Sequence, residues 1–138
     1  MTAKEYLKQI RIIHTKIENK KERLERISDL LTSPAVGEIK PDKVMTSVRL
    51  DKQEKLIAER VDLEDELQRL MYEEAVLMFK IGKQIDEMEN PTFSRILHLR
   101  YEEHLSLCDI AEKMGYSYDR IRHVHGIALL NFERKHMN

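Results

Sequence analysis

The stretch that decides the fold of the C-terminal part runs from Ser106 to Arg134 and reads SLCDIAEKMGYSYDRIRHVHGIALLNFER. Apolar residues recur in it every three or four positions, as they do along one face of a helix. Gly115 interrupts this pattern, and glycine commonly ends a helix because it tolerates the left-handed backbone conformation. The stretch therefore predicts two helices that meet at a tight turn.

Serines mark the points where both helices begin. Ser106 is followed three residues later by Asp109, which is close to the capping box that opens many helices. Ser117 follows the turn at Tyr116, and serine is among the preferred N-cap residues. We expect a short helix from Ser106 to Met114 and a longer one from about Tyr118 to His136.

A short helix, a tight turn with glycine and a second helix form the pattern of a helix-turn-helix. The two helices are expected to pack through Leu107, Ile110, Ala111, Met114, Ile121, Val124 and Ala128. In this motif the second helix enters the major groove of DNA. Arginine there can bond two acceptors of guanine at once, and aspartate can accept from cytosine. The residues predicted to bind DNA are Ser117, Tyr118, Asp119, Arg120, Arg122 and His123.

The same stretch resembles region four of bacterial sigma factors, the part that recognises the −35 promoter element. The resemblance covers about thirty residues, and Ile96–Tyr101 (ILHLRY) resembles the helix that precedes the motif in that family. It implies a domain of the winged-helix-like DNA-binding superfamily, with double-stranded DNA as partner and RNA polymerase as a further candidate. Two positions depart from the family: Tyr118 stands where a basic residue is usual, and His123 where glutamine is common.

The predicted domain begins at Asn90. Asparagine is a good N-cap, and proline suits the first position of a helix, so Asn90 and Pro91 predict a helix start. We expect this helix to run from Pro91 to about Glu103, with its apolar side chains facing inward, namely Phe93, Ile96, Leu97 and Tyr101. The C-terminal domain is accordingly placed at residues 90–138.

Two long helices are predicted in residues 1–89, from about Thr2 to Leu31 and from about Leu50 to Met88, with a loop at 32–49. Apolar residues recur along both at the seven-residue spacing of a coiled coil. They are Ala3, Ile10, Ile17, Leu24 and Leu31 in the first helix, and Leu56, Leu63, Leu70 and Leu77 in the second. These residues form an apolar seam along each helix. Two arrangements would bury the seam: the two helices can pair as a hairpin within one chain, or the long helices of two chains can pair in a homodimer. A homodimer would also carry two helix-turn-helix motifs and so gain avidity for DNA.

The composition agrees with an all-α fold, in which a long helical hairpin or coiled coil precedes a helix-turn-helix domain. The 138 residues include only 4 Gly and 3 Pro, too few for the many turns of a sheet protein, and the net charge is −1. One cysteine excludes an internal disulfide, and no spacing of metal ligands or phosphate-binding loop occurs, so we expect no metal, no cofactor and no enzymatic activity. No stretch is long and apolar enough to span a membrane, which favours a cytoplasmic protein.

The predicted function is sequence-specific DNA binding that regulates transcription. The layout resembles small phage and prophage regulators, with late-gene activators of the ArpU and RinA type as the nearest group. The alternative is a helical interaction factor, for phage assembly or packaging, that uses the helix-turn-helix as a scaffold.

Overall fold

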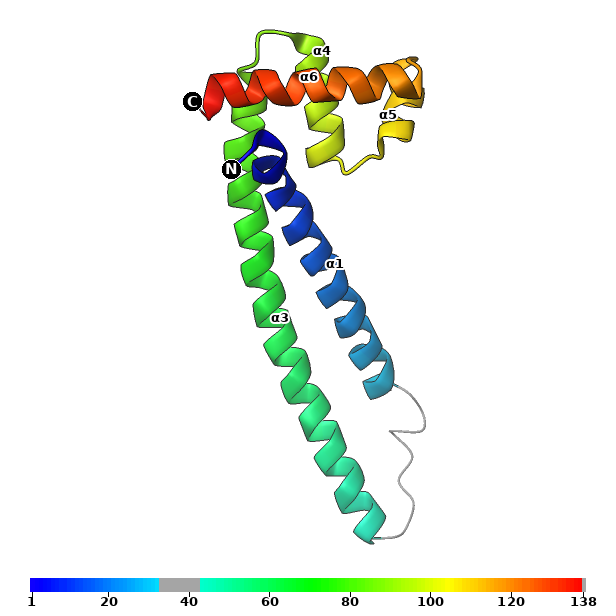
Figure 1. The fold of residues 1–138 in the computed structure, drawn as a ribbon. Helices are drawn as coiled ribbons and strands as arrows, with labels where there is room; N and C mark the ends of the chain where they lie inside the picture. Colours follow the sequence, from blue (N-terminus) through cyan, green and yellow to red (C-terminus); the bar gives the residue numbers. More distant parts are fainter. Residues whose placement is uncertain (33–42, 138) are drawn as a thin grey trace. The chain divides into compact units, whose positions relative to one another are not determined.

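The computed structural model describes residues 1–32 and 43–137, with side chains from residue 47 onward in the second of these ranges. Every regular element in these residues is helical, as the sequence predicts (Figure 1). The elements are α1 (Ala3–Thr32), α3 (Lys43–Asp86), α4 (Pro91–Leu97), the π-helical turn η1 (His98–Glu102), α5 (Leu107–Met114) and α6 (Tyr118–His136).

The chain forms two compact units that do not follow the predicted boundary at residue 90. One unit combines Met1–His14 with Glu73–Asn138, and the other comprises Thr15–Tyr72. We call them the terminal unit and the hairpin unit. The first turns of α1 belong to the terminal unit because their apolar side chains pack in one cluster with the end of α3 and the C-terminal half of α6, a long-range association that has no local signal in the sequence.

In the hairpin unit, α1 and α3 lie side by side and run in opposite directions (Figure 1). Ile17 and Ile27 of α1 are buried, as are Leu63 and Leu70 of α3. Lys20 Nζ lies 2.8 Å from Glu66 Oε2, and this ammonium group lowers the pKa of the Glu66 carboxyl. These buried residues of α1 and α3 correspond to the hairpin of the two predicted arrangements, while Leu24, Leu31 and Leu56 of the seam stay partly exposed.

The loop predicted at residues 32–49 is wrong at its C-terminal end, where the structure has a helix. Thr32 is the last residue of α1, and α3 begins at Lys43, seven residues before the predicted start at Leu50. Valine and threonine are frequent between residues 44 and 48, and these residues are weaker helix formers, so the local pattern concealed the helix. Residues 33–42 of the predicted loop lie outside the described residues.

Two apolar clusters fill the terminal unit, and the helix formed by α4 and η1 contributes to both. The first cluster joins the start of α1, the end of α3 and the C-terminal half of α6. Its buried members are Ala3, Leu7, Ile10, Ile81, Ile85, Met88, Leu97, Tyr101, Ala128 and Phe132. Ala128 was expected to pack against the short helix α5, but it belongs to this first cluster.

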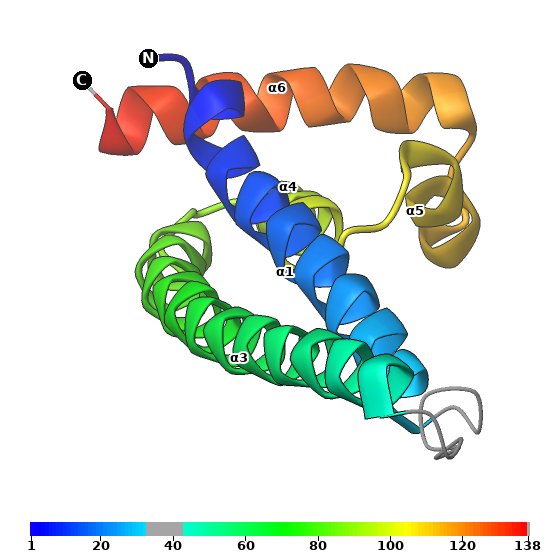
Figure 2. The same cartoon turned by 90° about the horizontal axis from the view of Figure 1, so that it is seen from below.

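The second cluster holds the helix-turn-helix together. Its buried members are Ile96, Leu99, Ile110, Ala111 and Ile121. Five partly buried residues surround it, among them the predicted Leu107, Met114 and Val124. Figure 2 shows the corresponding arrangement: α5 lies at the N-terminal end of α6, while the first turns of α1 lie toward its C-terminal half. α6 therefore contributes to both clusters and links the helix-turn-helix to the rest of the terminal unit.

Candidate nucleic-acid interface

The turn between α5 and α6 is built by the residues that the sequence singled out. The Ser106 hydroxyl accepts a hydrogen bond from the Asp109 N–H at 3.1 Å and caps α5. Gly115 ends that helix with φ 72° and ψ 29°, the left-handed conformation. The Tyr116 N–H then donates to the Ala111 carbonyl at 2.9 Å, which completes a Schellman motif. These bonds fix the direction in which the chain enters α6.

Ser117 caps the second helix of the motif. Its hydroxyl accepts from the Arg120 N–H at 3.2 Å, and its backbone is extended, with φ −69° and ψ 155°. The predicted bounds of this helix, Tyr118 to His136, are those of α6. Because the Ser117 hydroxyl is occupied by the cap, any contact of Ser117 with DNA would come in addition to a structural role.

Four of the predicted DNA-binding residues lie together on the exposed side of the first two turns of α6. They are Tyr118, Asp119, Arg122 and His123, all exposed to solvent. At about 100° per residue they fall within an arc of roughly 140° around the helix. We call this arc the recognition face. It presents one cation, one anion, one phenol and one imidazole, a set able to donate to and accept from base edges.

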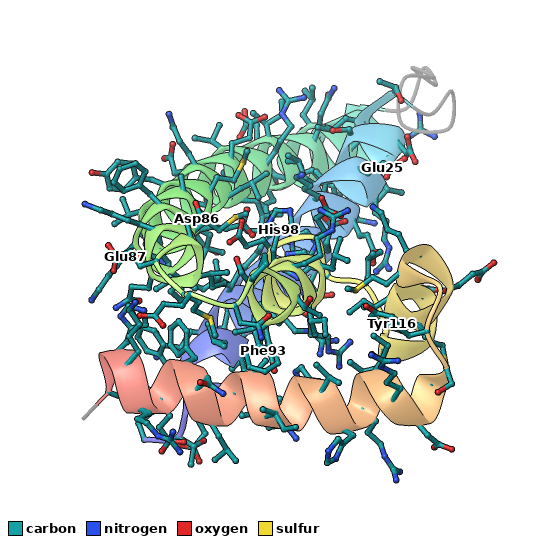
Figure 3. The ribbon with its side chains drawn as sticks, turned by 90° about the horizontal axis from the view of Figure 1, so that it is seen from above. Glu25, Asp86, Glu87, Phe93, His98 and Tyr116 are labelled. Carbon is teal, nitrogen blue, oxygen red and sulfur yellow. The ribbon has the colours of Figure 1, made fainter. Side chains whose placement is uncertain are left out.

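Arg120 points elsewhere. Its guanidinium carbon lies 4.4 Å from the centre of the Tyr116 ring, a cation–π contact. Tyr116 is located where α5 joins the start of α6 (Figure 3). Since Arg120 and Arg122 are two residues apart, they project about 200° away from each other on the helix. Arg120 is exposed and projects about 60° from His123, at the edge of the recognition face, and its guanidinium packs on Tyr116.

Residues 90–131 match the family model of sigma-70, region 4. This part of the chain is a sigma region-4-like helix-turn-helix, and the match supports DNA binding by it. The region-4-like segment contains the preceding helix of α4 and η1, the whole of α5, and α6 as far as Asn131, which includes the recognition face. The matched residues make up less than half of the chain. Comparison with curated proteins and with solved structures found no match.

Two residues on the same side of α6 escaped the sequence-based prediction. Gly126 and Leu130 follow Arg122 at intervals of four residues, and both are exposed, Leu130 by 62%. A Cβ built on Gly126 would have no other heavy atom within 4 Å, so packing within the chain does not require glycine there. The signal that could have found them is helical spacing from Arg122, together with the presence of glycine inside a helix.

A partly buried arginine supports the loop that leads into α5. Arg100 Nη1 donates to the Leu105 carbonyl at 2.9 Å. Burial lowers the pKa of the Arg100 guanidinium, and the nearby Arg11 charge acts in the same direction. An arginine pKa starts so high that the group keeps its charge, and Arg100 therefore fixes this loop as a cation.

A buried polar pair lies beneath α6 in the core of the region-4-like segment. Tyr101 Oη and His125 Nε2 are 3.0 Å apart and share a hydrogen bond. Burial raises the pKa of the Tyr101 phenol. Burial, with smaller effects of Arg100 and Lys4, lowers the pKa of His125 to about 4. His125 is accordingly neutral at neutral pH and holds α6 against η1.

A second histidine pair connects the start of α1 to the loop before α5. The His14 and His104 rings stack with their centres 3.9 Å apart, and His104 has a left-handed φ of 60°. Burial lowers the pKa of His104, as does the neighbouring His14. His14 Nδ1 also lies 3.3 Å from Glu74 Oε2 on α3. The loop that positions α5 is thus in contact with residues far away in the sequence.

Two kinds of site are absent from the residues that the structure describes. In them, no three histidine, cysteine, aspartate or glutamate side chains are grouped so that they could hold a metal ion. None of the helices in this part of the chain has the length and apolar character needed to cross a bilayer. Cys108, the single cysteine of the sequence, is exposed on α5.

Proposed function

We propose that this protein is a sequence-specific DNA-binding regulator of transcription that places α6 in the major groove. The observation that carries the proposal is the recognition face: four polar side chains exposed on the second helix of a region-4-like helix-turn-helix. The proposed function is binding alone, without catalysis and without a cofactor.

The chemistry of the recognition face indicates how it would select a sequence. Arg122 can donate two hydrogen bonds to O6 and N7 of a guanine, and Asp119 can accept from the amino group of a cytosine. Tyr118 and His123 differ from the residues usual in sigma factors. We therefore expect a target other than the −35 promoter element.

The proposal also includes the kind of regulator, its location in the cell and its protein partners. The long helices followed by a region-4-like domain support a phage or prophage regulator of the ArpU or RinA type, acting in the cytoplasm of a bacterial host. Region 4 belongs to a subunit of RNA polymerase, which supports polymerase as a protein partner. Two helix-turn-helix motifs bind DNA more firmly than one, and this favours a homodimer.

Selection of binding sites from random duplexes by the full-length protein, at a fixed salt concentration, tests the proposal. We expect one enriched sequence. Arg122→Ala should then weaken binding to it by about 1–3 kcal/mol and relax the preference at one base pair. Arg26→Ala is the matched control: it removes the same charge from an exposed position of α1, outside the region-4-like segment.

Two results would contradict the proposed function. One is the absence of any enriched sequence. The other is an equal loss of affinity in both variants, because this would point to a general effect of charge on binding to phosphates. Recovery of a packaging or assembly complex by a protein that binds no specific DNA would support the alternative interaction factor.

A further inference from the structure

The first turns of α1 carry a row of cations along one side. Lys4, Lys8 and Arg11 follow each other at intervals of four and three residues, so at about 100° per residue they fall within an arc of roughly 60°. Lys4 and Lys8 are exposed, and Arg11 is partly buried. We call these three residues the basic row of α1. The sequence of Ala3–His14 contains one acid, Glu5, and this residue projects about 100° from Lys4.

Contacts of α1 within the terminal unit fix the direction in which the basic row faces. On one flank of the row, the His14 ring stacks on the His104 ring in the loop before α5, with 3.9 Å between the ring centres. Leu7, on the same flank, is buried in the cluster with Ala128 and Phe132, where α1 meets the C-terminal half of α6 (Figure 2). The basic row therefore lies along the edge of α1 that is nearest to α6 and to the loop before α5.

A fourth cation connects the basic row with the recognition face. Arg100 lies in η1, and burial is the main cause that lowers the pKa of its guanidinium. The Arg11 charge adds to this shift and the Tyr118 phenol opposes it, so Arg100 lies close to both. Arg100 and Lys4 also add to the effect of burial that lowers the pKa of His125. The cations of α1 and η1 thus form one group beside the N-terminal half of α6.

The recognition face begins on the side of α6 that adjoins this group of cations. Tyr118 and Arg122 project about 20° and about 60° from His125 around the helix, while Asp119 and His123 project further round in the same direction. Tyr118 and Arg122 are both exposed. A duplex that binds the recognition face is therefore brought toward the basic row.

The charges of the region-4-like segment indicate what the basic row can add. Residues 90–131 contain five Lys or Arg and five Asp or Glu, so this segment has no net charge with which to attract DNA. Among the described residues, neither Arg100 nor any residue of the basic row forms an ion pair with a carboxylate. A group of unpaired like charges raises the local concentration of anions at the surface.

The length of the basic row suits a strand of DNA. From Lys4 to Arg11 the row extends about 10 Å, at a rise of roughly 1.5 Å per residue. One strand of B-DNA carries a phosphate about every 3.4 Å along the helix axis, so the row spans about three phosphates. Lysine and arginine side chains supply many of the contacts that proteins make with these groups.

We propose that the basic row of α1 binds DNA phosphates beside the bases that the recognition face reads. The inference rests on the proposed function and adds a second contact surface, outside the region-4-like segment, to the same DNA-binding site. Phosphate contacts supply affinity and fix the position of a protein on the duplex, but they do not read the sequence. The basic row thus strengthens binding, and the recognition face selects the site.

The salt dependence of DNA binding by the full-length protein tests the basic row. Each phosphate contact contributes about 0.9 to the slope of log affinity against log salt concentration. Lys4→Ala combined with Lys8→Ala should therefore reduce the slope by about 2, and it should weaken binding to the selected duplex and to a mixed-sequence duplex by the same factor. Lys16→Ala combined with Lys21→Ala is the matched control, because it removes the same charge from exposed positions of α1 outside the terminal unit. We expect this control to keep the slope of the unchanged protein.

Ethylation interference locates the contact on the DNA. Ethylation removes the charge of a single phosphate, so it weakens binding where the protein contacts that phosphate. We expect interference beside the base pair whose preference Arg122→Ala relaxes, and we expect the variant without Lys4 and Lys8 to lose it while selecting the same bases. An unchanged interference pattern, or a changed base preference, would overturn the assigned role. Helical content from circular dichroism verifies that the variants are folded.

The outcomes separate the basic row from the proposed function. If the protein selects a site and the variant without Lys4 and Lys8 binds it as the control does, the basic row is overturned and the regulator stands. If the protein binds mixed-sequence duplex alone and this variant lowers the salt slope, the basic row stands and the regulator is contradicted. A protein that binds no duplex overturns both.

Discussion

Gly126 is the residue whose identity the folded chain explains least. It lies inside α6 on the exposed side, where glycine destabilises a helix by about 0.5–1 kcal/mol relative to alanine. Glycine is tolerated where another backbone or a ligand must come close, and Gly126 follows Arg122 of the recognition face by one turn. If α6 lies in the major groove as proposed, the missing Cβ would let DNA come closer to the backbone of α6 at this point.

Gly126→Ala should accordingly raise the stability of the protein and weaken its binding to DNA. We expect the free energy of unfolding to increase by up to about 1 kcal/mol, measured with urea. We expect affinity for the selected site to fall because the added methyl group occupies space between helix and DNA. Asn131→Ala, on the opposite side of α6, is the control and should leave the affinity unchanged. Unchanged affinity in Gly126→Ala would show that DNA does not come close there.

His125 gives the stability of the protein a dependence on pH. Its pKa is about 4 in the folded protein, against an ordinary value of 6.5, so the unfolded chain takes up a proton at a higher pH than the folded one. The stabilisation is complete above about pH 6.5 and is lost as the pH falls toward 4, with a slope of at most about 1.4 kcal/mol per pH unit. Urea unfolding between these values measures it.

His125→Gln removes this titration and keeps a polar group next to Tyr101. We expect a smaller decrease in the free energy of unfolding between pH 6.5 and 4 than in the unchanged protein. His104, whose pKa burial also lowers, remains in both proteins, so the difference between them isolates His125. Equal slopes in the two proteins would mean that His125 does not stay neutral on folding.

At the scale of helices, the sequence predicts best where the signals are local. Ser106, Gly115 and Ser117 act on backbone atoms within four residues, so the bounds of α5 and α6 follow from the sequence. The recognition face follows from the same bounds and from helical spacing. The prediction for Arg120 stays a prediction: its contact with the Tyr116 ring depends on how the turn folds, which helical spacing does not show.

The sequence predicts less well those features that depend on contacts between residues far apart in the chain. The seven-residue seam predicts two long helices, yet it is compatible with pairing inside one chain or between chains, and only packing decides. The early start of α3 at Lys43 was missed because that part carries little of the seam.

At the scale of the molecule, the terminal unit joins the two ends of the chain. Leu7 and Ile10 of α1 are fully buried in a cluster with Ala128 and Phe132 of α6, more than a hundred residues later. The helix that carries the recognition face therefore has part of its support at the start of the chain. This explains why the predicted boundary at residue 90 cuts through a compact unit.

Leu7→Ala tests whether the stability of α6 depends on α1. Removing a fully buried leucine side chain lowers the free energy of unfolding by about 2–5 kcal/mol. If the terminal unit folds as a whole, hydrogen exchange of the α6 amides from Ala128 to Phe132 should speed up with this loss of stability. Ile12→Ala, at a 54% exposed position of the same helix, is the control and should change exchange in α6 far less. Unchanged exchange in α6 of Leu7→Ala would mean that residues 90–138 fold without α1, as the sequence-based boundary implies.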